Sequence, residues 1–168
     1  MQFKEALKNL ESSKEFKEWR KENKEDYLVH GFASLVGYED EPFNWQIGYY
    51  NKKNDKITPF DVGENVIIGE PSEAFKKTNS IEELDMKKVK IGLTEALKKV
   101  EHKQKEEYAR QTPMKIFCVL QNYEKYKEIW NITLITATMN TLNMKVDPSN
   151  GKIVEDKLTS LMSFAQES

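Results

Sequence analysis

One short series of motifs occurs twice in this chain, and that repetition limits the available folds more than any other feature. The helix-forming string EALKNLE at residues 5–11 is matched by EALKKVE at residues 95–101. Each string is followed by a β-prone segment centred on a tryptophan, Trp45 in the first case and Trp130 in the second. Each segment then leads to a similar turn, NDKI at residues 54–57 and NGKI at residues 150–153. The shared order of helix, tryptophan strand and turn predicts an internal repeat.

The repeat predicts the class of fold and the division of the chain. A helix followed by antiparallel strands, present twice, is an α+β pattern. We expect two tandem helix-plus-antiparallel-sheet modules, at residues 1–70 and 91–168, which are separate or share one sheet. Residues 71–90 are polar and charged but not rich in glycine and serine. We therefore expect an ordered connector there, with a short helix starting near Ser72 or Ser80.

The first module begins with a segment that favours two short helices over one long helix. Ser12 and Glu15 have the spacing of a capping box, which marks a helix start. An unbroken helix would place Phe3 and Phe16 roughly 140° apart around its axis, so its apolar face would not be continuous. We therefore expect a break near residues 12–13.

Strand-forming segments follow in both modules. Pro59 lacks a backbone N–H, which predicts that its strand lies at an edge of the sheet. Gly92 precedes the clearest helix, and residues 142–146 alternate apolar and polar side chains, as in an antiparallel strand buried on one side. We expect strands at residues 27–36, 43–50, 56–62, 66–68, 114–120, 129–137, 142–146 and 152–156, with a docked tail at 158–164.

Three segments of the second module match the pattern of a known type of domain: GLTEAL at residues 92–97, WNITL at residues 130–134 and VDPSNGKI at residues 146–153. Together they resemble the helix opening, central strand and closing turn of the PepSY-type domain family. The resemblance covers about residues 90–158. A weaker copy covers about residues 3–62, where Asn51 and Asp55 replace the expected Asp and Gly.

The PepSY resemblance carries expectations about fold and role. It implies a helix packed on an antiparallel sheet. PepSY-type domains occur in thermolysin-type protease propeptides and in many envelope proteins. The resemblance therefore also implies a role in binding or inhibiting peptidases, and it brings no catalytic residues.

Residues of catalytic or metal-binding type are present without the partners that such chemistry needs. His30 and His102 have no His or Cys at ligand spacing, and Cys118 alternates with apolar residues as a buried thiol does. If Gly151 took the glycine position of an EF-hand loop, the first ligand position would fall on Val146. We therefore predict no catalytic, cofactor-binding or metal-binding residues.

Composition restricts partners and location. The formal net charge is −2, and Arg20 and Arg110 are the only arginines, which argues against nucleic-acid binding. No apolar run approaches the roughly 20 residues of a membrane-spanning helix, and the first residues lack the apolar core of a signal peptide. As given, the sequence predicts a soluble cytoplasmic protein, or an extracytoplasmic one if a signal or anchor was removed.

Aromatic residues are dense in the first tryptophan strand and its return strand. Trp45, Tyr49, Tyr50 and Phe60 are therefore the candidate partner-binding residues, as an exposed aromatic surface for a peptide or a second subunit. The other interpretation places Trp45 and Trp130 in the core as equivalent anchors.

These observations predict a non-enzymatic binding module whose partner is a peptidase or another protein. Binding would use a sheet edge or the hairpin aromatics. The alternative is a small-ligand-binding or enzymatic domain with a pocket between helix and sheet. A third option is a homodimer built through edge strands.

Overall fold

The computed structural model describes residues 1–74 and 81–163, which form an α+β fold with helices on a large antiparallel sheet. The helices are α1 (Phe3–Ser12), α2 (Lys14–Glu22), the short 3-10 helix η1 (Met86–Lys88) and α3 (Leu93–Glu107). The strands are β1 (Tyr27–Leu35), β2 (Trp45–Asn51), β3 (Lys56–Val62), β4 (Val66–Ile68), β5 (Ser72–Glu73), β6 (Pro113–Tyr123), β7 (Lys127–Thr136), β8 (Asn140–Val146) and β9 (Ile153–Ser160).

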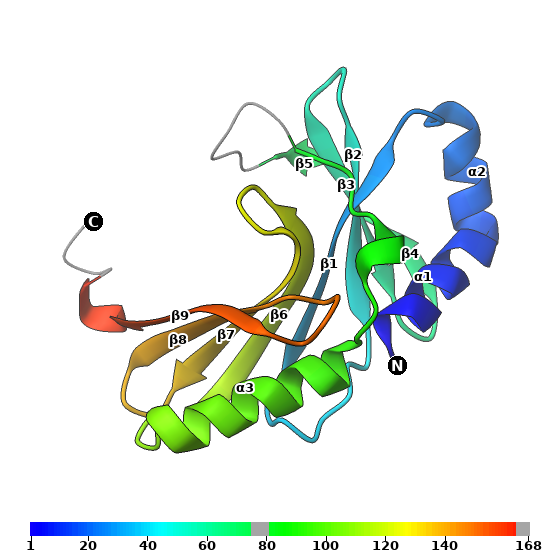
Figure 1. The fold of residues 1–168 in the computed structure, drawn as a ribbon. Coiled ribbons are helices and arrows are strands. Elements are labelled where there is room, and N and C mark those ends of the chain that lie inside the picture. Colours follow the sequence, from blue (N-terminus) through cyan, green and yellow to red (C-terminus); the bar gives the residue numbers. More distant parts are fainter. Residues whose placement is uncertain (75–80, 164–168) are drawn as a thin grey trace.

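The sheet runs in the order β4-β3-β2-β1-β6-β7-β8-β9, and β5 pairs with β3. Every neighbouring pair is antiparallel. Strand β1 pairs with β6 from His30↔Gln121 to Leu35↔Ile116, which joins strands of the two halves of the chain. The sheet is curved, and α1, α2 and α3 lie on its outer side (Figure 1).

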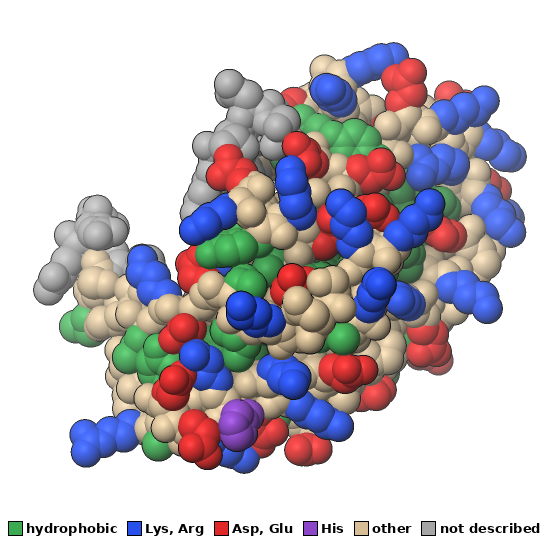
Figure 2. All heavy atoms as spheres, viewed as in Figure 1, with side chains coloured by type: hydrophobic (Ala, Val, Ile, Leu, Met, Phe, Trp, Pro, Cys, Tyr) green, Lys and Arg blue, Asp and Glu red, His purple; other side chains and the backbone are tan. Residues whose placement is uncertain are grey.

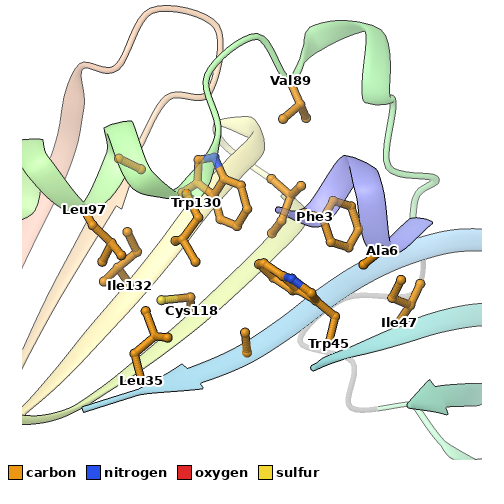
Figure 3. Close-up of a cluster of buried hydrophobic side chains, with 14 of the residues drawn as sticks. Phe3, Ala6, Leu35, Trp45, Ile47, Val89, Leu97, Cys118, Trp130 and Ile132 are labelled. Carbon is orange, nitrogen blue, oxygen red and sulfur yellow. The ribbon is translucent and has the colours of Figure 1, made fainter. Parts of the chain in front are cut away.

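The core fills the space between these helices and the sheet as one apolar cluster. Trp45 and Trp130 are both fully buried in it, with ring centroids 6.1 Å apart. Phe3 of α1 packs edge-on against Trp45 at 5.1 Å, and Val89 lies over the same cluster (Figure 3). Aromatic residues of this size contribute strongly to a core, because each removes roughly 150–250 Å² from water.

Each buried indole also ties its strand to the start of a helix. The Trp45 Nε1–H donates to the carbonyl oxygen of Met1 at 3.0 Å, and the Trp130 Nε1–H donates to that of Ile91 at 3.1 Å. Both acceptors stand two residues before a helix, α1 at Phe3 and α3 at Leu93. A buried N–H needs such a partner, so the two hydrogen bonds fix where the helices begin relative to the sheet.

The predicted break in the N-terminal helical segment is present, but its cap differs. Helix α1 ends at Ser12 and α2 begins at Lys14. The hydroxyl of Ser13 accepts the backbone N–H of Phe16 at 3.1 Å, so Ser13 is the N-cap and the expected capping box at Ser12 was wrong by one residue. At α3, Gly92 is the N-cap as predicted.

The predicted edge position of the Pro59 strand was wrong. Strand β3 lies between β2 on one side and β4 and β5 on the other. Pairing with β4 involves residues 60–62 and pairing with β5 involves residues 56–57, so Pro59 falls in the gap between them. The Pro59 carbonyl still accepts the N–H of Gly69 at 2.8 Å. Because the two β-partners are short, the missing N–H costs the ladder little.

Residues 81–90 are held against the sheet and the β8–β9 turn by packing and hydrogen bonds. Leu84 and Val89 are buried, the Leu84 N–H donates to the carbonyl of Leu28 at 2.8 Å, and the Lys90 N–H donates to that of Pro148 at 2.9 Å. The helix expected near Ser72 is strand β5 instead, and Ser80 lies outside the described residues.

The predicted tail begins as part of strand β9. Residues 158–160 belong to β9 and residues 161–163 form a helical turn, while Phe164 lies outside the described residues. Among the described helices, none has the length and apolar character needed to cross a bilayer.

Candidate functional site: the uncovered face of the sheet

The four aromatic candidates predicted from the sequence do not form a surface. Trp45 and Phe60 are fully buried, and Tyr49 and Tyr50 are only 2 % exposed. The prediction of an exposed aromatic surface was therefore wrong. The other interpretation, in which Trp45 and Trp130 are core residues, agrees with their burial.

Packing against the helices explains the burial of this aromatic group. The rings of Tyr49 and Phe60 lie 5.1 and 5.5 Å from that of Phe16 on α2. Tyr50 points to the opposite side of β2, but the ring of Tyr27 covers it at 5.6 Å and its hydroxyl donates to Asp55. The aromatic residues predicted as a surface thus pack against α2, in the case of Tyr49 and Phe60, or are covered at the end of β2, in the case of Tyr50.

The opposite face of the sheet is the candidate site, because no described helix covers it. Residues directly paired across antiparallel strands point to the same side. One continuous row runs from Phe32 on β1 through Val119 on β6 and Asn131 on β7 to Lys145 on β8. Phe32, Val119 and Asn131 are half-buried, so this row is accessible at its centre. We call this side of the sheet the uncovered face.

The middle of the uncovered face is apolar. The rings of Phe32 and Phe117 stack with centroids 6.1 Å apart and planes 22° apart. Val119 lies opposite Phe32, and the half-buried Ile135 lies opposite Lys115, two rows further along the strands. The Lys115 ammonium stands 5.7 Å from the centre of the Phe117 ring. The uncovered face therefore has an apolar centre with the ammonium group of Lys115 at its margin.

A network of amide and hydroxyl groups crosses β7 and β8 beside the apolar centre. The Asn143 amide donates to the side-chain oxygen of Asn131 at 2.6 Å and to the Thr133 hydroxyl at 2.9 Å. The Lys145 ammonium donates to the Asn143 amide oxygen at 2.9 Å and to Glu155 on β9 at 3.1 Å. These bonds hold the polar side chains in fixed positions across three strands.

The tip of the β6–β7 hairpin bends over one end of this network. Tyr123 and Tyr126 stack with centroids 6.5 Å apart. The Tyr126 hydroxyl donates to Glu155 at 2.9 Å, and the Tyr123 ring lies 5.3 Å from the Lys145 ammonium. The hydrogen bond from Lys145, followed by that from Tyr126, lowers the pKa of Glu155. The tip thus buries Lys145 and keeps Glu155 ionised.

His30 occupies the row beside the apolar centre, between Gly48 and Gln121. Its imidazole lies directly on Gly48, where an added Cβ would stand 2.2 Å from the His30 Cε1 atom. Burial lowers the pKa of His30. This pair was not predicted from the sequence, although a glycine inside a strand signals close approach by another group.

The other residues of reactive type lie away from this face. Cys118 points into the core, where burial raises the pKa of its thiol to about 12. His102 lines an open groove of about 610 Å³ between α3 and the β8–β9 turn, together with Lys99, Lys103, Glu106, Glu107, Gly151 and Ile153. Basic and acidic side chains are mixed over the helices (Figure 2). Within residues 1–74 and 81–163, no group of three or more His, Cys, Asp or Glu side chains fits a metal ion.

Comparison with known proteins finds a similar fold but no family and no function. No family model matches the chain. No curated protein matches it either. The crystal structure of a putative lipoprotein from Clostridium difficile 630 superposes with a TM-score of 0.52 and 11 % sequence identity, over 86 % of this chain and 90 % of that one. At this identity, the likeness shows a shared fold alone.

Proposed function

We propose that this protein is a non-enzymatic module that binds a protein partner through the uncovered face of its sheet. The supporting observation is the continuous row Phe32–Val119–Asn131–Lys145, with the stacked Phe32 and Phe117 rings at its β1 end. An apolar centre with a fixed polar surround has the composition of a protein interface. Aromatic residues of this kind commonly dominate binding energy.

The face is better suited to binding than the sheet edge that was also predicted. Strand β9 is the edge on one side, and it carries Glu155, Asp156 and Lys157 in succession. Charged side chains on an edge strand discourage pairing with a further strand. A homodimer formed through such an edge stays a prediction, and light scattering over a range of concentrations tests it.

We also propose that the two halves are duplicated PepSY-like modules, at residues 1–70 and 91–168. Support comes from the matched hydrogen bonds of Trp45 and Trp130, whose acceptors stand two residues before α1 and α3. The PepSY resemblance makes a peptidase the first partner to test. The lipoprotein description of the Clostridium neighbour favours an extracytoplasmic location over a cytoplasmic one.

The alternative of a pocket between helix and sheet has less support. The space between α3 and the sheet is filled by buried side chains, among them Leu97 and Ile132 (Figure 3). The groove beside His102 is open and lined mainly by charged groups, which differs from the enclosed, largely apolar pockets of small-ligand sites.

A matched pair of variants tests the binding proposal. Phe117→Arg places a charge in the apolar centre of the uncovered face, whereas Phe43→Arg changes an aromatic side chain that is 80 % exposed in the loop before β2. Both variants are compared with the wild type in pull-downs from the source organism, after circular dichroism has shown that they fold.

We expect a partner, identified by mass spectrometry, to be retained by the wild type and by Phe43→Arg and lost by Phe117→Arg. Recovery of a peptidase in this pattern supports the inhibitor role. Equal recovery by both variants contradicts binding through the uncovered face, and recovery of a bound metabolite alone contradicts the proposed role.

A further inference from the structure

We infer that the uncovered face binds an acidic polypeptide segment, whose carboxylates meet lysines on strands β6 to β9. This inference rests on the proposed function, because it names the chemistry of the partner that the face would bind. It is carried by three observations: the charge of this part of the face, the unused hydrogen-bond donors beside it, and the curvature of the sheet.

The first observation is an uneven distribution of charge. Register places Lys115, Lys145 and Lys157 on the uncovered face, in rows with Ile135, Asn131 and Asn143. The acid that shares this part of the face is Glu155 on β9, which faces Lys145. Glu155 is already engaged by Lys145 at 3.1 Å and by Tyr126 at 2.9 Å.

Two of these lysines keep their charge available. Lys115 and Lys157 are exposed, and within the described residues neither has a carboxylate within 4.0 Å. This local excess of positive charge stands in a chain whose formal net charge is −2. Charge complementarity therefore selects an acidic partner for this area.

The second observation is that two amide side chains on the face, those of Asn131 and Gln121, keep N–H donors without an acceptor in the described part of the chain. Asn131 uses its amide oxygen to accept from Asn143, and its amide NH2 has no acceptor among the described residues. The side chain of Gln121, in the adjoining row with His30, also makes no hydrogen bond within that part of the chain. Free donors beside free ammonium groups favour a partner rich in acceptors, such as carboxylates.

The third observation is the shape of the sheet, which favours a polypeptide over a membrane surface. The uncovered face is on the inner side of the curve, opposite the helices (Figure 1). A bilayer is flat and would touch the rims of such a surface, whereas an extended chain follows it. The stacked Phe32 and Phe117 rings lie beside Lys115, on β1 and β6, and can receive apolar side chains of the same segment.

The spacing of the lysines sets the pattern of the segment. Lys115 on β6 and Lys157 on β9 are separated by three inter-strand spacings, and their rows differ by two residues along the strand. With about 4.8 Å between strands and about 3.4 Å per residue, this corresponds to roughly 16 Å. In an extended chain, carboxylates about four or six residues apart lie on one side and span roughly this distance.

The test uses the full chain labelled with 15N and titrated with three capped synthetic peptides of equal length. These are an alternating Glu–Thr peptide, its Gln–Thr counterpart and its Lys–Thr counterpart. The double variant Lys115→Glu/Lys157→Glu is compared with Lys8→Glu/Lys98→Glu, which makes the same change in net charge on exposed positions of α1 and α3.

We expect the Glu–Thr peptide to shift amide resonances of β6 to β9 and to bind the face variant about tenfold more weakly than the control variant. The Gln–Thr and Lys–Thr peptides are expected to bind at least several-fold more weakly than Glu–Thr. Added salt should weaken Glu–Thr binding, because exposed charges are screened.

Three results overturn the inference. If Gln–Thr or Lys–Thr binds this face as tightly as Glu–Thr, the acidic requirement is wrong while binding through the face stands. If the control variant weakens binding as much as the face variant, or if no peptide binds, the proposed recognition by Lys115 and Lys157 is wrong. The proposed function is then still tested separately by the pull-down with Phe117→Arg. If anionic phosphatidylglycerol vesicles, and not the peptide, bind in a manner lost in the face variant, the surface recognises membranes.

Discussion

At the residue scale, a few side chains connect distant parts of this fold. The indoles of Trp45 and Trp130 each combine full burial with a hydrogen bond to the carbonyl before a helix. A second close fit lies on the other side of the sheet, where Gly48 leaves room for the imidazole of His30. In both cases a single atom decides the geometry: an indole N–H in the first and an absent Cβ in the second.

Replacing either indole tests its double role. Trp130→Phe removes the donor to Ile91 and leaves a gap in the core, so we expect the free energy of unfolding to fall by about 1–3 kcal/mol. Trp45→Phe should cost a similar amount, because its N–H bonds Met1 in the same way. Urea unfolding followed by circular dichroism measures both. Trp19→Phe is the control, since Trp19 is only partly buried, and an equal loss there would contradict a special role for the two indoles.

The burial of His30 predicts a pH dependence of stability. Its pKa is lowered from the ordinary 6.5, so below that pH the unfolded state binds a proton that the folded state does not. The free energy of unfolding should therefore be fully retained above pH 6.5 and should decrease as the pH falls towards the lowered pKa of the folded state. His30→Gln should lose this part of the dependence, as measured by urea unfolding over a pH series. The matched variant is His102→Gln on α3, and loss of the dependence there instead would contradict the assignment to His30.

At the scale of elements, the β6–β7 hairpin holds part of the uncovered face in place. Its tip contacts β8 through Tyr123 and Lys145 and contacts β9 through Tyr126 and Glu155. Strand β3 shows another effect at this scale, since two short partners on one side leave a gap where Pro59 fits. Contacts between elements, more than the propensity of each one, thus determine which backbone groups must be paired.

The hairpin contact predicts a local change in dynamics. Tyr126→Phe keeps the ring stacked on Tyr123 but removes the hydrogen bond to Glu155. We expect faster hydrogen exchange of amides in residues 123–127 and a loss of global stability of only about 0.5–1.5 kcal/mol. Tyr38→Phe, which removes a hydrogen bond to Gln104 on α3, should leave exchange at the tip unchanged. Unchanged exchange at the tip in Tyr126→Phe would show that the hydrogen bond does not hold it.

At the scale of the whole molecule, the two halves of the chain share one sheet order and one core. The β1–β6 pairing joins them along the backbone, and the contact between Trp45 and Trp130 joins them through side chains. Cys118 lies in this central region, opposite Ala33, and both residues are buried. Within residues 1–74 and 81–163, one half therefore cannot open without exposing apolar side chains of the other.

This arrangement predicts one cooperative unfolding transition. Tryptophan fluorescence and far-ultraviolet circular dichroism should give the same urea midpoint, and Cys118 should react with a thiol reagent only as the whole chain unfolds. Burial supports the second expectation, since it raises the pKa of the Cys118 thiol to about 12. Two separate midpoints, or labelling of Cys118 before the main transition, would mean that the halves are independent units.

Local patterns in the sequence predicted the elements well where a residue depends on its near neighbours. The break between α1 and α2, the strand at Lys56–Val62 and the glycine cap of α3 were all predicted, because helix caps and alternation act within a few residues. The interpretation of Tyr50 failed, since the ring that covers it comes from Tyr27 on another strand. The edge position of Pro59 failed for the same reason.

The sequence by itself determined α1, α2 and α3, most of the strands, and the buried side of strands with clear alternation such as residues 142–146, because periodicity in a single segment specifies its buried side. Only the tertiary structure decided that β1 pairs with β6 and that Phe32, Val119, Asn131 and Lys145 form one row. Strand neighbours are chosen by contacts between residues far apart in the chain, and no local pattern encodes those contacts. For that reason, the uncovered face emerged from the fold and not from any motif.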